Sequence, residues 1–125
     1  MVVFLDTGDL AMMEKYADSV AGFTTNPSLL CKSGVTNYRQ YAQMVLAASQ
    51  GKPVSFEVLA DDFETMASQA RELASWGLNV FVKVPATNTH GESCANLIRV
   101  LSLEGIKLNV TAVFTFAQIE TLARC

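Results

Sequence analysis

The chain has 125 residues, of which 50% are hydrophobic and 17% are charged, and its formal net charge is −3. This composition excludes an intrinsically disordered protein, and nine scattered basic residues without a basic stripe argue against binding to nucleic acid. No apolar run approaches the ~18 residues that a membrane helix needs, and the start of the sequence lacks the positively charged region of a signal peptide.

The three cysteines, Cys31, Cys94 and Cys125, are irregularly spaced and form no CxxC pair. Such cysteines are typical of small, buried apolar side chains in a reducing compartment, so we expect a cytoplasmic protein. The spacing favours neither a disulfide framework nor a metal site.

The first part of the chain contains two short predicted strands. Val2–Asp6 is apolar and β-branched, and Asp9 can cap a helix after it; the buried face of that helix is Leu10, Met13 and Ala17. Gly22–Thr25 is the second strand, which ends at Asn26-Pro27. A short helix follows Pro27 and is predicted to stop at Ser33-Gly34.

The middle of the chain predicts two longer helices around a third strand. The first has apolar residues at helical spacing and ends at Gly51; these residues are Tyr38, Tyr41, Ala42, Val45 and Leu46. Pro53–Leu59 is the strand. Asp61 or Asp62 caps the next helix, which closes at Gly77; its apolar face is Phe63, Met66, Ala67, Ala70, Leu73 and Ala74.

The last part predicts two more strands. Asn79–Pro85 is followed by a loop over Ala86–Gly91 and by a helix that ends at Gly105, whose apolar face is Cys94, Leu97, Ile98 and Leu101. The fifth strand covers Ile106–Phe114, and Thr115 opens a final helix. The single histidine, His90, lies in the loop, where we expect a solvated or helix-start residue rather than a base.

Five strands alternating with helices indicate βαβ units and a parallel sheet. The spacing suits a TIM barrel or a doubly wound sheet, and residues 1–125 show no linker or repeat, so we expect one domain. The turn after the first strand, Asp6-Thr7-Gly8-Asp9, lacks the glycines of a dinucleotide fingerprint.

Polar residues near the ends of all five strands favour the barrel, because barrel enzymes carry their working residues at the carboxyl ends of strands. These residues are Asp6, Thr25, Asn26, Glu57, Lys83, Asn109 and Thr111. The two-residue period of a strand groups Phe4 with Asp6, Ser55 with Glu57, Phe81 with Lys83 and Asn109 with Thr111 on one face. The residues between them, Leu5, Phe56, Val82 and Val110, are then expected to face the helices.

Lys83 is the residue of the apolar fourth strand that composition does not explain. Burial generally disfavours the ammonium form of a lysine, and a free amine is the nucleophile of Schiff-base chemistry on a carbonyl substrate. The alternative is a lysine at a strand end that extends its charged group into water. The polar residues of the other strands favour the catalytic interpretation.

Four ordered motifs resemble the signatures of transaldolases, and more narrowly the short transaldolase-like group that includes fructose-6-phosphate aldolase. They are Leu5-Asp6-Thr7, Thr24-Thr25-Asn26-Pro27-Ser28, Phe81-Val82-Lys83-Val84-Pro85 and Glu104-Gly105-Ile106-Lys107-Leu108-Asn109-Val110-Thr111. The resemblance implies a TIM (β/α)8 barrel of the class I aldolase type, with Lys83 as the Schiff-base residue and neither cofactor nor metal.

The resemblance also implies a role for each polar residue. Asp6 moves the proton of the cleaved hydroxyl, unless it only caps the next helix. Glu57 is a general acid/base acting through a water that Thr111 holds, unless it forms a salt bridge at the rim. Asn26 and Asn109 bind substrate hydroxyls, although Asn26-Pro27 is also an ordinary turn, and Thr25 is expected mainly to support the substrate site.

The implied activity is the transfer of a dihydroxyacetone unit between phosphorylated ketose and aldose sugars, in the pentose phosphate pathway, by a homo-oligomer. By the same resemblance, transaldolases carry Glu at position 57, whereas fructose-6-phosphate aldolase, the alternative, carries Gln. Glu57 therefore favours transaldolase activity. A full barrel takes about 250 residues, so we expect the first five β/α units only, without the family's phosphate-binding serine and arginine. Two rivals remain: an inactive half-barrel that self-associates, and another lysine-dependent aldolase, such as one for deoxyribose phosphate.

Overall fold

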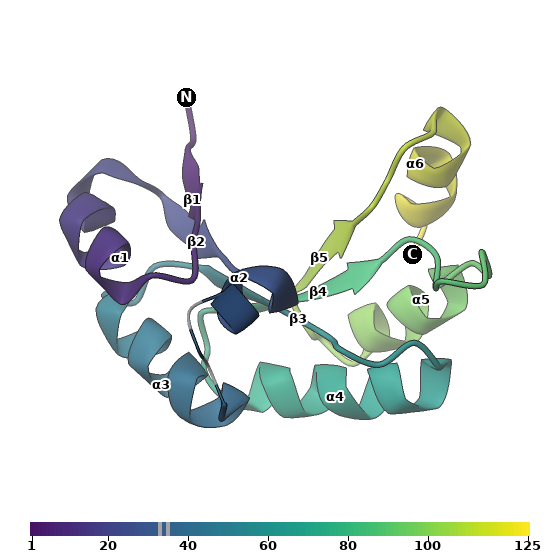
Figure 1. The fold of residues 1–125 in the computed structure, drawn as a ribbon. Coiled ribbons are helices and arrows are strands. Elements are labelled where there is room, and N and C mark those ends of the chain that lie inside the picture. Colours follow the sequence, from purple (N-terminus) through teal and green to yellow (C-terminus); the bar gives the residue numbers. More distant parts are fainter. Residues whose placement is uncertain (33, 35) are drawn as a thin grey trace. The chain divides into compact units, whose positions relative to one another are not determined.

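The computed structural model describes residues 1–32, 34 and 36–125 of the chain. Within these residues the protein is α/β, with five parallel strands alternating with helices, as predicted (Figure 1). Hydrogen bonds join β1 to β2, β2 to β3, and β4 to β5. Their bounds are β1 Phe4–Asp6, β2 Gly22–Thr24, β3 Val54–Glu57, β4 Val80–Pro85 and β5 Leu108–Thr111.

The helices lie between the strands, at the positions that apolar periodicity and capping residues predict. Asp9 caps α1 by accepting from the amide of Ala11 at 2.8 Å, and Asn37 caps α3 by accepting from the amide of Gln40 at 3.0 Å. These caps satisfy amide groups that the first turn of a helix leaves unpaired. The bounds are α1 Leu10–Tyr16, η1 Ala17–Ser19, α2 Pro27–Lys32, α3 Tyr38–Ala48, α4 Phe63–Ser75, α5 Ala95–Leu103 and α6 Phe116–Leu122.

The chain divides into two compact units. The first unit comprises Met1–Glu57 with Trp76–Val80, and the second comprises Val58–Ser75 with Phe81–Cys125. Each unit has its own strands and helices and its own buried apolar side chains. In the first unit these include Phe23, Val45, Val54 and Phe56, and in the second they include Val82, Val84, Ile98 and Leu101.

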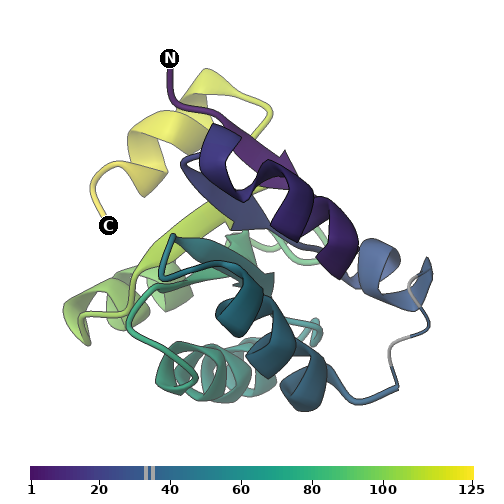
Figure 2. The ribbon, with the colours of Figure 1, turned by 90° about the vertical axis from the view of Figure 1, so that its left-hand side faces the viewer.

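In the first unit, β1, β2 and β3 pair in parallel, with Phe4 opposite Gly22 and Thr24 opposite Ser55. Figure 2 shows α1 and α3 on the same side of these strands, which they cover. The buried side chains of the two helices are the predicted ones: Met13 in α1 and Tyr41, Ala42 and Val45 in α3.

Three aromatic side chains of the first unit pack together near the end of β3. The ring of Tyr38, at the start of α3, makes edge-to-face contacts with Phe56 and Trp76, at centroid distances of 6.1 and 5.5 Å. Phe56 and Trp76 also pack edge to face, at 5.9 Å. Mutual contacts of this kind stabilise beyond the area that they bury, so the three rings hold one another in a fixed arrangement.

In the second unit, β4 pairs with β5 in parallel, and burial alternates along β4. Val80, Val82 and Val84 are buried, whereas Phe81, Lys83 and Pro85 are half-buried. This alternation confirms that Val82 faces the interior and that Phe81 and Lys83 share the other face. Helices α4 and α5 bury the predicted apolar residues Met66, Ala70, Leu73, Ile98 and Leu101.

Several predictions about ends and burial are wrong. The first strand starts at Phe4 rather than Val2, and the third ends at Glu57 rather than Leu59. Cys31 is exposed, whereas Cys94 is buried as predicted. Phe63, at the first turn of α4, is 38% exposed. The predicted helix end at Ser33-Gly34 involves Ser33, which is outside the described residues. No helix of the described part is long and apolar enough to cross a bilayer.

Candidate functional site

Lys83 and Asn109 are direct neighbours across the β4–β5 pair. The register places Lys83 opposite Asn109 and Pro85 opposite Thr111. Opposing residues of a parallel pair project to the same face, so Lys83, Asn109 and Thr111 lie on one face of the second unit. All three side chains are half-buried. The carbonyl of Lys83 accepts from the amide of Val58 at 3.2 Å, which fixes the backbone of β4 at this residue.

A second polar group lies at the ends of β1 and β2 in the first unit. The hydroxyl of Thr24 donates to Oδ1 of Asp6 at 2.7 Å, and Nδ2 of Asn26 donates to Oδ2 of the same carboxylate at 3.5 Å. Oδ1 of Asn26 accepts from the amide of Leu29 at 3.0 Å, in the first turn of α2. Asn26 therefore links the carboxylate of Asp6 to the start of a helix. Asp6 does not cap α1, because Asp9 does.

Thr25 lies on the opposite face of β2 from this group. Its side chain is fully buried, and its hydroxyl donates to the carbonyl of Ser55 at 3.0 Å. The structure thus brings Thr24, not Thr25, to Asp6. Sequence reasoning missed Thr24, although the two-residue period counted back from Asn26 points to it.

Glu57 ends β3, and its backbone is bound by a side chain. The hydroxyl of Tyr38 donates to the carbonyl of Glu57 and accepts from its amide, both at 3.1 Å. Burial raises the pKa of the Tyr38 phenol far above its ordinary value, and the charge of Glu57 contributes to the rise. The phenol therefore keeps its proton, and it can donate and accept at the same time.

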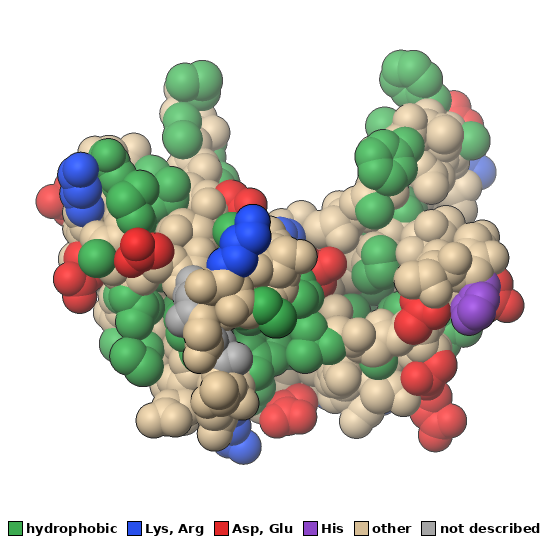
Figure 3. All heavy atoms as spheres, viewed as in Figure 1, with side chains coloured by type: hydrophobic (Ala, Val, Ile, Leu, Met, Phe, Trp, Pro, Cys, Tyr) green, Lys and Arg blue, Asp and Glu red, His purple; other side chains and the backbone are tan. Residues whose placement is uncertain are grey.

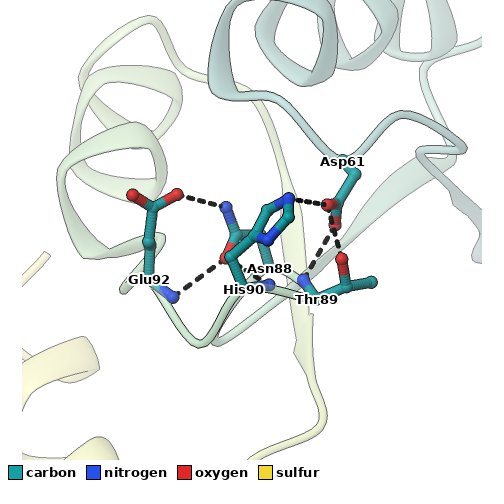
Figure 4. Close-up of polar contacts among 5 residues, drawn as sticks. All are labelled: Asp61, Asn88, Thr89, His90 and Glu92. Atoms are coloured by element: carbon teal, nitrogen blue, oxygen red, sulfur yellow. Dashed lines mark hydrogen bonds and ion pairs between the residues drawn. The ribbon is translucent and has the colours of Figure 1, made fainter.

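The loop after β4 is tied to the loop after β3 within the second unit (Figure 4). The carboxylate of Asp61 accepts from the amide of Thr89 at 2.8 Å and from its hydroxyl at 2.6 Å. These two hydrogen bonds lower the pKa of Asp61. His90 lies 3.6 Å from the same carboxylate. We call these three residues the Asp61 clasp.

The buried side chain of Asn88 holds the loop after β4 through three hydrogen bonds. Its Oδ1 accepts from the amides of His90 at 3.1 Å and Glu92 at 2.9 Å, and its Nδ2 donates to the Glu92 carboxylate at 2.7 Å. Asn88 is buried, whereas the side chain of His90 is 77% exposed, as predicted for a solvated residue (purple in Figure 3).

A pocket of about 360 Å³ lies beside the clasp, lined by Asp61, Asp62, Phe63, Asn88, His90 and Glu92. Its carboxylates are engaged in local hydrogen bonds: Asp61 binds Thr89, Asp62 caps α4 through the amide of Thr65 at 2.8 Å, and Glu92 binds Asn88. In the described part of the chain, no three His, Cys, Asp or Glu side chains are grouped so that they could hold a metal ion.

Five parallel strands with helices between them define an α/β protein built from βα units, and its fourth strand carries a half-buried lysine. The family model for transaldolase/fructose-6-phosphate aldolase matches residues 3–125. The chain belongs to this family.

Relatives named "Probable transaldolase" match nearly the whole chain. Those of Dehalococcoides mccartyi and Thermoanaerobacter sp. are 39% and 40% identical to it over 94% and 99% of its length. A third, from Clostridium acetobutylicum, is 36% identical over 99% of the chain. The matches cover 54 to 56% of these proteins. The chain therefore spans about half the length of the curated relatives it matches.

Proposed function

We propose that the chain takes part in a transaldolase reaction, in which a dihydroxyacetone unit passes between sugar phosphates through a Schiff base on a lysine. The observation that carries the proposal is the place of Lys83: a half-buried lysine in an otherwise apolar strand, opposite Asn109, in a member of this family. Phosphorylated ketoses and aldoses are the proposed substrates, in the cytoplasm and in the pentose phosphate pathway.

In the proposed reaction, Nζ of Lys83 attacks the carbonyl carbon of the ketose, and the carbinolamine loses water to give an iminium ion. Asp6 takes the proton of the hydroxyl on C4, two carbons away from the iminium carbon C2, and the bond between C3 and C4 breaks. The electron pair of that bond moves into the iminium, which becomes an enamine, and an aldehyde leaves. The enamine then attacks an acceptor aldehyde, and water releases the new ketose from Lys83.

The other side chains assist these steps. We propose that Glu57 acts as general acid/base for loss and addition of water, through a water that Thr111 holds. Asn109 and Asn26 bind substrate hydroxyls. Thr24 shares the Asp6 carboxylate with Asn26 and so keeps it oriented, and Thr25 supports β2 from the buried face.

Fructose-6-phosphate aldolase activity is the second candidate, because the family contains both activities. In that reaction the enamine takes up a proton instead of an aldehyde, and dihydroxyacetone is released. The carboxylate at position 57 favours transfer. The two activities separate when fructose 6-phosphate is supplied alone: a transferase retains the dihydroxyacetone unit, whereas an aldolase releases it.

The test is borohydride trapping of the full 125-residue chain with fructose 6-phosphate, followed by mass spectrometry of the intact protein and its peptides. We expect a reduced adduct on the peptide that contains Lys83, with the mass of a dihydroxyacetone unit. Lys83→Ala removes the adduct. Lys107→Ala is the matched control, because Lys107 is an exposed lysine just before β5, and its loss leaves the adduct in place.

Absence of an adduct in a folded wild-type chain overturns the proposal. Light scattering after size-exclusion chromatography then tests the alternative of an inactive, self-associating chain, for which a discrete dimer is expected. An adduct with a different carbon unit, formed from deoxyribose 5-phosphate, supports the other lysine-dependent aldolase instead.

A further inference from the structure

Tyr38 holds the backbone of Glu57 beyond the end of a strand pair. The β2–β3 register ends at Thr24 opposite Ser55, two residues before Glu57. Past that point the Tyr38 hydroxyl bonds both backbone groups of Glu57, with two distances of 3.1 Å. A side chain from α3 thus provides at Glu57 the donor and acceptor that a strand neighbour would provide.

The phenol is itself held firmly. Its ring lies edge to face against Phe56 and Trp76, and Phe56, the residue before Glu57, is fully buried. Burial raises the pKa of the hydroxyl, so the phenol is protonated and can donate at neutral pH. A fixed donor on a fixed ring leaves little freedom to the main chain at Glu57.

We propose that Tyr38 is a positioning residue: it fixes the main chain at Glu57 and thereby the direction in which the Glu57 carboxylate projects. This inference rests on the proposed function, in which Glu57 transfers protons as Lys83 gains and loses water. A general acid/base acts only within hydrogen-bond reach of its proton, and small displacements of such groups cost large factors in rate. The hydroxyl of Tyr38 therefore acts on the reaction through Glu57.

The test compares Tyr38→Phe with Tyr41→Phe. Tyr41 is the matched control, because it lies one turn away on the same helix and its buried hydroxyl donates to the carbonyl of Gly8 at 2.5 Å, away from Glu57. The readout is the rate of adduct formation on Lys83 with fructose 6-phosphate and borohydride, measured across pH. We expect Y38F to be slower by about ten-fold or more, with the pH profile of Glu57→Gln. Y41F should match the wild type.

A double-variant cycle separates positioning from general stability. If Tyr38 acts through Glu57, Y38F/E57Q is no slower than E57Q alone, because the group that Tyr38 positions is already gone. If the two losses multiply, or if Y38F traps substrate as fast as the wild type, the inference is overturned while the proposed function stands. A wild type that forms no adduct overturns the proposed function, and this inference with it.

Should Y38F fail to fold, Trp76→Phe carries the same test. It removes the larger ring that packs on Tyr38 and leaves the hydroxyl in place, so the phenol is held less firmly. We expect W76F to slow trapping in the wild-type background and to have no effect in the E57Q background. Equal slowing in both backgrounds contradicts the inference.

Discussion

Gly22→Ala should destabilise the first unit, because the strands β1, β2 and β3 leave no room for a side chain there. A Cβ atom at Gly22 would lie 2.7 Å from the carbonyl oxygen of Pro53 and would overlap the ring of Phe4. The ring is 46% exposed and can turn away. The carbonyl cannot move freely, because it accepts from the amide of Phe23 at 2.8 Å. Relief of the clash therefore requires β2 and β3 to separate.

The expected loss follows from three contributions. Overpacking of this kind costs about 1–3 kcal/mol, and a weakened hydrogen bond costs about 0.5–1.5 kcal/mol. The alanine lowers the entropy of the unfolded chain, which offsets about 0.4–1 kcal/mol. The net effect is a loss of about 2 kcal/mol in the free energy of unfolding.

The measurement is urea unfolding followed by the fluorescence of Trp76, the single tryptophan, which lies in the first unit. With a slope of about 1–3 kcal/mol per molar, a loss of about 2 kcal/mol should lower the midpoint by about 0.7–2 M. Gly77→Ala is the matched control in the same unit: its nearest contact would be 3.1 Å, with the side chain of Asn79. That contact is tighter than an ordinary one but involves a side chain rather than backbone, so the midpoint of Gly77→Ala should fall less than that of Gly22→Ala.

The outcome in a Phe4→Ala background decides whether the carbonyl is the obstacle. Phe4→Ala removes the ring and leaves the carbonyl of Pro53, so Gly22→Ala should still cost most of its original value. If the glycine substitution becomes neutral once the ring is gone, the carbonyl yields more easily than we argue, and the reasoning is refuted.

Two further predictions concern the second unit. The pKa of Asp61 is lowered by its bonds from Thr89, so the clasp is fully formed above the ordinary value of 3.8 and is lost as the pH falls through the lower, folded-state value. The NMR shift of the Thr89 amide should show a step in that acidic range, with no such step in Asp61→Asn and an unchanged one in Asp62→Asn; a wild-type amide without that acidic step would contradict this. Ala112 has φ of 54°, a left-handed conformation that glycine adopts without strain, so Ala112→Gly should raise the free energy of unfolding by about 0.5–1 kcal/mol. Ala117→Gly, inside α6, should instead lower it by about 1 kcal/mol. Equal effects of the two substitutions in urea unfolding would exclude backbone strain at residue 112.

The order of elements and the faces of β4 were readable from the sequence, because they depend on local periodicity. Val80, Val82 and Val84 alternate with Phe81 and Lys83, and the structure buries the valines. The extent of the strands was not readable in the same way. Val2 and Val3 have strand propensity, but β1 starts only at Phe4, because strand formation depends on packing against neighbours that the sequence pattern does not reveal.

Partners of polar side chains were the part that sequence patterns could not supply. Periodicity placed Tyr38 on the apolar face of its helix but did not predict the hydrogen-bond partner of its hydroxyl. That partner depends on how far α3 extends towards β3. Thr24 and Thr25 are chemically equivalent in the sequence, and only their faces distinguish them. For the same reason, Asp61 and Asp62 were equal candidates for capping α4.

The neighbouring aspartates Asp61 and Asp62 divide two tasks between them. Asp62 serves the helix that follows it, and Asp61 reaches 28 residues ahead to Thr89. Short polar connections usually tolerate the gain or loss of a residue. Here a deletion would leave one carboxylate both to cap α4 and to bind Thr89, and an insertion would separate two carboxylates that must be adjacent. The spacing of this connection is therefore constrained in length even where its composition is free to vary.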